Sequence, residues 1–141
     1  MHSSLKFSVV PGTFAVCRFP AKAPVPPWAA KAFTSITRTS EELSIICEER
    51  RLPADVGGAD FQLERGWTLL KLQGPFTLDA IGVLASVTKP LAEAAISVFS
   101  ISTFDTDYLL VKRIHAKQAI AALTLAGHRL VDPTSGAFRR S

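Results

Sequence analysis

The spacing of apolar and polar positions in the second half of the chain predicts six consecutive elements. Apolar residues at helical spacing define two helices, and short β-rich runs between turn residues define the strands. The expected strands cover 67–72, 95–102, 107–112 and 128–131, and the expected helices cover 79–94 and 116–126. Pro90 lacks an amide hydrogen and should distort the first helix, and Gly127 should end the second. The order β-α-β-β-α-β predicts a ferredoxin-like unit, with an antiparallel sheet and both helices on one face.

The first half repeats part of this pattern at an offset of 65 residues. Leu5–Phe7 matches Leu70–Leu72, and Ser35–Ile46 matches Ser100–Val111 without a gap. The same offset in two separate segments favours an internal repeat over chance similarity between hairpins. Three prolines within 21–27 exclude a regular helix there, so the first copy is irregular. We therefore expect an α+β chain of two tandem ferredoxin-like units, 1–62 and 63–132, and a loose tail over 133–141.

Composition narrows the class of protein. The 141 residues are 48% apolar, with 16 Lys and Arg against 12 Asp and Glu for a net charge of +4. This is too apolar for a disordered chain, and the mean hydropathy of +0.24 favours a further buried interface, which predicts a homodimer. No apolar run approaches the roughly 20 residues of a membrane helix, and no basic stripe with interleaved aromatics indicates nucleic-acid binding. Cys17 and Cys47 match neither a disulfide framework nor a zinc site, so we interpret both as reduced residues in strands of a cytoplasmic protein.

Several segments resemble tandem ACT-domain proteins. The segments that resemble the small bacterial members of this family are Phe14–Arg18, Ser35–Thr39, Glu42–Ile45, Ile81–Ser86 and Pro90–Ala94. Ser100–Val111 resembles both these proteins and the ACT modules of the eukaryotic cytosolic arginine sensors. The resemblance covers about residues 5 to 131. It implies a regulatory module that binds a small effector, usually an amino acid, and we expect no catalytic activity, no cofactor and no metal.

The resemblance also implies where the effector lies. In such modules it sits between two ACT units, against the loop that joins the first strand of one unit to its first helix. In this chain that loop supplies Gly74, Pro75, Phe76, Leu78, Asp79, Ile81 and Gly82. The likeness to the arginine sensors adds Thr103, Phe104 and Asp107, with Asp107 facing a cationic group of the ligand.

The residues themselves leave alternatives open. A glycine-containing loop that enters a helix suits a carboxylate, but Gly74 can equally serve only to turn the chain, and Gly82 can allow close packing on the sheet. Asp107 can bind a ligand ammonium or accept hydrogen bonds from the 103–106 turn. Arg38, which corresponds to Thr103 in the first copy, can hold a ligand carboxylate in a bidentate contact or can be a solvated charge.

Catalytic motifs are not suggested by the sequence. The three histidines are far apart along the chain, and phosphate-binding glycine motifs and nucleophile–histidine motifs are missing. Two functions from different classes remain. The first is an effector-binding regulatory module that passes ligand occupancy to an unidentified protein partner. The second is a ligand-free assembly module that uses the edge of the ACT sheet.

Overall fold

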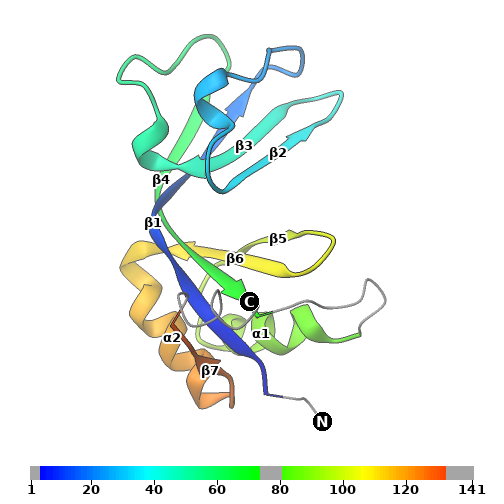
Figure 1. The fold of residues 1–141 in the computed structure, drawn as a ribbon, viewed down its shortest axis with the longest axis vertical. Helices are drawn as coiled ribbons and strands as arrows, with labels where there is room; N and C mark the ends of the chain where they lie inside the picture. Colours follow the sequence, from blue (N-terminus) through cyan, green and yellow to red (C-terminus); the bar gives the residue numbers. More distant parts are fainter. Residues whose placement is uncertain (1–3, 74–80, 133–141) are drawn as a thin grey trace, which may run out of the picture. The chain divides into compact units, whose positions relative to one another are not determined.

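The computed structural model of this protein describes residues 4–73 and 81–132 (Figure 1). Its contacts divide the chain into two units. One unit combines Met1–Pro11 with Thr68–Ser141, and the other is Gly12–Trp67. The second unit is thus inserted into the first, whereas the sequence predicted consecutive units over 1–62 and 63–132. The difference arises because the beginning of the first strand, at Lys6 and Phe7, pairs with Arg129 and Leu130 late in the chain.

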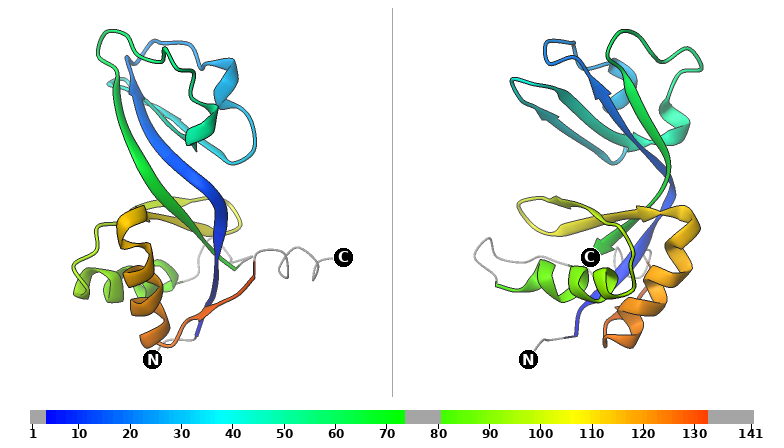
Figure 2. Two further views of the ribbon diagram at one scale, coloured as in Figure 1. Left: turned by 90° about the vertical axis from the view of Figure 1, so that its left-hand side faces the viewer. Right: turned by 180° about the vertical axis from the view of Figure 1, so that it is seen from behind.

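Two long strands, β1 (Lys6–Phe19) and β4 (Gln62–Leu72), take part in both units. They run side by side in opposite directions (Figures 1 and 2). The boundary between the units falls within both strands, close to Gly12 and Gly66. These two glycines have φ angles of +104° and +80°, a conformation that other residues rarely adopt within a strand. Glycine at these two positions therefore permits a backbone conformation that would be strained for other residues.

The Gly12–Trp67 unit has the strand order β2-β3-β1-β4, with β2 at Thr34–Arg38 and β3 at Leu43–Glu48. Residues 12–67, all of which the structure describes, form the short 3-10 helices η1 (Pro27–Ala29) and η2 (Glu49–Arg51) but no α-helix. The α-helices that a regular ferredoxin-like unit carries on one face of its sheet are therefore absent from residues 12–67. Prolines before η1 exclude a longer helix, and the core is closed instead by Trp28, Phe19 and Phe61 over buried residues of β1 and β3.

The other unit contains the predicted order of elements. After β4 come α1 (Val83–Glu93), β5 (Phe99–Ser102), β6 (Asp107–Lys112), the 3-10 helix η3 (Arg113–His115), α2 (Ala116–Leu125) and β7 (Arg129–Leu130). Its strand order is β7-β1-β4-β6-β5. Lys6 and Phe7 of β1 pair in parallel with Arg129 and Leu130 of β7. The strand β1 therefore lies between β7 and β4 in this sheet. The result is a mixed α and β fold with few helices and a largely antiparallel sheet.

One face of this sheet carries both α-helices (Figure 2). Alternate residues of β4 and β6 point toward them, together with Phe7 of β1. Val87 and Leu91 of α1 and Ala119 and Leu123 of α2 close the core, and all four are fully buried. Burying a valine or leucine side chain contributes roughly 1.5–3 kcal/mol, so the helices are held mainly by this apolar layer.

The sequence predicted a distortion at Pro90, and the structure accommodates this residue without ending the helix. The helix α1 continues through Pro90 to Glu93, although proline cannot donate a hydrogen bond to the carbonyl of Ser86 four residues earlier. The Nε2 atom of His128 lies 2.9 Å from that carbonyl oxygen. A histidine next to β7 therefore replaces the missing backbone donor.

Candidate functional site

The predicted site residues fall into four groups. Gly74, Pro75, Phe76, Leu78 and Asp79 lie outside the described residues. Thr103, Phe104 and Asp107 come together at the tip of the β5–β6 hairpin, and Ile81 and Gly82 lead into α1. Arg38 ends β2 in the other unit.

The tip of the β5–β6 hairpin is closed by threonine hydrogen bonds. The amide of Thr103 donates to the carbonyl of Thr106 at 2.8 Å, and the amide of Thr106 donates to the Thr103 hydroxyl at 3.2 Å. The buried hydroxyl of Thr106 donates to the carbonyl of Leu72 at 2.6 Å. This last bond ties the tip to the end of β4, where the predicted effector loop begins.

The carboxylate of Asp107 is anchored by its partner across the hairpin. Ser102 stands opposite Asp107 in the register, and its hydroxyl donates to Oδ1 of Asp107. The donor is thus Ser102 rather than a group of the 103–106 turn that the sequence suggested. Asp107 is half-buried, and Phe104 in the turn of the same hairpin is 76% exposed. The tip therefore combines a positioned negative charge with an exposed aromatic ring.

The neighbouring residue of β6 is also partly withdrawn from water. Burial raises the pKa of the Tyr108 phenol above its ordinary value, because the charged phenolate is less well solvated there. Tyr108 stands opposite Ile101 in the hairpin register.

Gly82 is the residue that begins α1. Its φ of +82° is in the left-handed region, and a side chain added there would meet no atom within 4 Å. Close packing on the sheet, which the sequence left open, is therefore not the reason for this glycine. As a glycine, this N-cap residue has no side chain with which to cap α1. Figures 1 and 2 show the start of α1 and the tip of the β5–β6 hairpin at the same end of this unit.

Arg38 lies in a hairpin built like that of β5 and β6. The amide of Thr39 donates to the carbonyl of Glu42 at 2.9 Å, and the Thr39 hydroxyl accepts from the Glu42 amide at 3.1 Å. Thr39 therefore corresponds to Thr103, an offset of 64 (103 − 39) in place of 65. Arg38 corresponds to Ser102, and its guanidinium donates to the carbonyl of Ala21. Arg38 is an exposed residue with a local partner.

The described residues contain no helix with both the length and the apolar character of a membrane span. They also bring no group of three or more His, Cys, Asp or Glu into a metal-binding arrangement. Cys17 and Cys47 are free, buried thiols in β1 and β3. A hydrogen bond between the two thiols is the main cause that raises the pKa of Cys17, and burial raises it further. The same hydrogen bond lowers the pKa of Cys47.

Comparison with known proteins assigns the family. The family model for the ACT domain matches residues 62–124, and a second model, for an N-terminal domain, matches residues 12–55. The crystal structure of an Agrobacterium tumefaciens protein is 37% identical to this chain, with a TM-score of 0.82. The similarity covers 93% of this chain and 95% of that one. The chain belongs to the family of this Agrobacterium protein and contains an ACT domain.

Two further structures are similar to this ACT-domain protein. A Vibrio cholerae protein of unknown function, described as a possible transport protein, is 22% identical with a TM-score of 0.68 over 87% of each chain. The regulatory subunit of aspartate kinase from Thermus thermophilus, in a ligand-free form, is 13% identical with a TM-score of 0.59. That similarity covers 85% of this chain and 95% of the subunit. At these identities the likeness concerns the fold. No functionally curated protein matches the chain.

Proposed function

We propose that this protein is a non-catalytic regulatory module whose ACT domain binds a small effector, most simply an amino acid. The observation that carries the proposal is the carboxylate of Asp107, which is half-buried and held at the hairpin tip by Ser102. Thr106 fastens the same tip to the end of β4. A charge anchored in this way is pre-organised for a cationic group. The fold shared with a regulatory subunit of aspartate kinase supports a regulatory role.

The two charged groups of an amino acid have complementary partners in this proposal. Its ammonium group pairs with Asp107. Its carboxylate lies near the first turn of α1, where the N-cap residue is a glycine and the helix dipole is positive. The resemblance to the arginine sensors supports the choice of Asp107 as the cation partner.

The test is a thermal-shift screen of the twenty amino acids, followed by variants of Asp107. A ligand at about 100 times its Kd adds about 2.7 kcal/mol to the stability of the folded state, which raises Tm by several degrees at this chain length. We expect Asp107→Asn to keep the fold, because Asn is nearly isosteric and still accepts from Ser102. The variant should lose most of the ligand-induced shift, since a charge-assisted hydrogen bond contributes roughly 1.5–3 kcal/mol.

The matched control is Asp105→Asn in the exposed part of the same turn. It removes the same charge two residues away and should leave the ligand response intact. Equal ligand shifts in the wild type and both variants would remove Asp107 from the site. If the role of Asp107 is purely structural, Asp107→Asn should instead lower the free energy of unfolding without ligand by about 1 kcal/mol or more. The ligand-induced shift in Tm should then be unchanged.

The alternative function is ligand-free assembly, and the position of β5 favours it. This strand is last in the strand order, so one of its edges is not covered by another described strand. Phe99 on β5 is 38% exposed, and open edges of this kind invite pairing. We propose that the protein forms a homodimer in the cytoplasm, with a protein partner and without nucleic-acid or membrane binding. Light scattering that shows only a monomer of 15.2 kDa at high concentration would contradict the dimer.

We also propose that Gly12–Trp67 is a second, irregular ACT-like unit. Its strand order β2-β3-β1-β4 follows the ferredoxin-like arrangement if η1 and η2 stand in the places of the two helices. The matching turns at Thr39 and Thr103 support an internal repeat. A solved structure in complex with an effector, together with a search for a second occupied site, tests this reading.

A further inference from the structure

A charged cleft lies within the Gly12–Trp67 unit, and neither the sequence pattern nor the family comparison assigns it a role. Its volume is about 320 Å³, and its lining residues come from β1, the end of β3, η2 and β4: Gly12, Thr13, Glu48, Glu49, Arg50 and Arg65. The strand β3 ends at Glu48, opposite Phe14 of β1. The cleft therefore opens where β1 continues beyond the end of its neighbour. Its size is at the lower end of the range for small-molecule sites, roughly 300–1,000 Å³.

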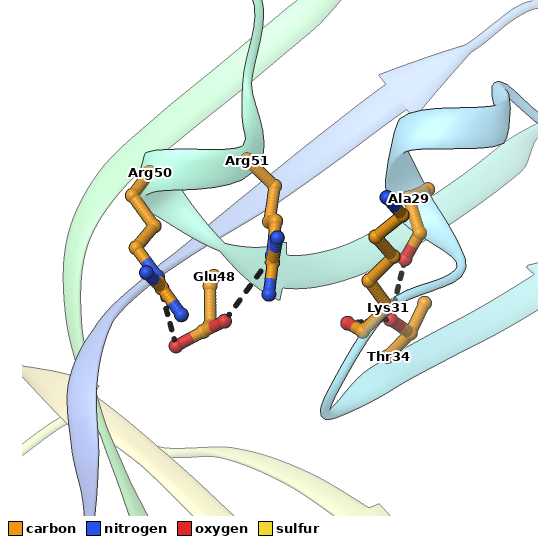
Figure 3. A network of polar contacts seen from close by, with 6 residues as sticks. All are labelled: Ala29, Lys31, Thr34, Glu48, Arg50 and Arg51. Atoms are coloured by element: carbon orange, nitrogen blue, oxygen red, sulfur yellow. Dashed lines mark hydrogen bonds and ion pairs between the residues drawn. The ribbon is translucent and has the colours of Figure 1, made fainter.

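One of the residues that line the cleft carries a nearly buried carboxylate. The Glu48 side chain is only 13% exposed, and its two oxygens face Arg50 and Arg51 at 3.5 and 3.4 Å (Figure 3). A side chain at Gly12 would come within 3.2 Å of Glu48 Oε2, so the glycine leaves room for this group beside the strand. With cations on both sides, the charge of Glu48 is already balanced.

The second carboxylate is also engaged. Glu49 accepts a hydrogen bond from the Gly66 amide at 3.1 Å through Oε1, and its Oε2 lies 3.8 Å from Arg65 Nη1. The Arg50 and Arg65 side chains remain 72% and 53% exposed. Their ion-pair separations exceed the 2.7–2.9 Å of strong charge-assisted hydrogen bonds. Each guanidinium carries five N–H donors, and its contact to glutamate is made by a single nitrogen, so both retain donors for another anion.

We propose that this cleft is a binding site for a small oxyanion, in which Arg50 and Arg65 hold a carboxylate or phosphate group by forked hydrogen bonds. The two glutamates orient the guanidiniums rather than contact the ligand. Counting Arg51 behind Glu48, three positive charges face two negative ones, which leaves one positive charge for the ligand. The site lies in a different unit from Asp107, and the inference does not rest on the proposed effector function.

Isothermal titration of the full chain with succinate, glutamate and inorganic phosphate tests the proposal. We expect saturable binding of at least one of the three, and the comparison between them separates a carboxylate ligand from a phosphate. Arg50→Gln and Arg65→Gln should each weaken that binding about tenfold or more, because each removes a forked contact. Arg50→Lys keeps the charge beside Glu48 but not the planar fork, so it should also weaken binding.

The matched control is Arg113→Gln, which removes one positive charge from an exposed position in the other unit. It should bind the anion as the wild type does. Melting curves without anion show whether each variant is folded. If Arg50→Gln does not fold, Arg50→Lys replaces it as the test of this position. Failure of all three anions to bind, or equal weakening in Arg113→Gln and Arg50→Gln, would overturn the site.

Discussion

At the scale of single residues, Pro90 and His128 form a pair that explains an unusual helix. Pro90 removes a backbone donor from the middle of α1, and His128 Nε2 contacts the Ser86 carbonyl at 2.9 Å in its place. The other ring nitrogen, Nδ1, accepts from the Leu5 amide at 3.1 Å. Because Nδ1 accepts, the neutral ring carries its hydrogen on Nε2 and donates it to Ser86. One buried histidine therefore joins α1 to the beginning of the chain.

His128→Phe should lower the free energy of unfolding by about 1–3 kcal/mol, because the Leu5 amide and the Ser86 carbonyl lose their partner. Urea unfolding measures the change. In a Pro90→Ala background the restored backbone N–H can reach Ser86, so the cost of His128→Phe should fall. His115→Phe is the control, since this side chain makes no capping bond at the start of α2. Equal costs of His128→Phe in both backgrounds would contradict the pairing of Pro90 with His128.

At the scale of elements, both α-helices end in the same motif but with different residues. At the end of α2, Gly127 has a φ of +102°, and the His128 amide donates to Leu123 at 3.0 Å. At the end of α1, Ala95 takes the same place with a φ of +61°, and the Ile96 amide donates to Leu91 at 2.9 Å. A non-glycine residue in the left-handed region costs roughly 1–2 kcal/mol. The end of α1 therefore carries backbone strain at Ala95, whereas glycine avoids this strain at the end of α2.

Ala95→Gly should therefore stabilise the protein by up to about 1 kcal/mol, as the relief of strain outweighs the greater freedom of the unfolded chain. Gly127→Ala should destabilise it by about 1 kcal/mol for the converse reason. Thermal or denaturant unfolding of the two variants provides the comparison. A loss of stability in Ala95→Gly would show that its methyl group contributes more than its backbone strain costs.

The pattern of apolar residues and turn residues along the chain predicted several element boundaries well. The strand over 107–112 is confirmed at both ends, and the second helix differs only at its last residue. The strand predicted over 95–102 begins at Phe99 instead, because Ala95 and Ile96 complete the end of α1. Thr106 was not predicted as a site residue, since its partner is a backbone carbonyl 34 positions away in the chain.

At the scale of the whole molecule, the order of the units along the chain was the feature that local patterns could not predict. The pairing of Lys6 and Phe7 with Arg129 and Leu130 joins residues from opposite ends of the chain. The carbonyl of Lys6 also accepts from the Gln73 amide at 2.8 Å. An apolar strand at the N-terminus is compatible with several neighbours, and only the completed core around Phe7 selects one. The ACT-domain match begins at residue 62 and does not include this strand.

The interleaved order leads to a prediction about which parts of the chain fold alone. The Lys6–Gln73 bond joins β1 and β4 at one end of this unit's strand pair, and the unit boundary lies after Pro11 on β1 and before Thr68 on β4. Replacing residues 12–67 with Asn-Gly, which favours a tight hairpin turn, should therefore give a folded protein with cooperative melting and helical circular dichroism. The fragment 63–132 should not fold stably, because it lacks the buried Phe7, whose loss alone costs roughly 3–5 kcal/mol. It also lacks the Leu5 amide that His128 binds. Equally cooperative melting of both proteins would show that the N-terminal strand is dispensable, and an unfolded hairpin-joined protein would show that this unit needs residues 12–67.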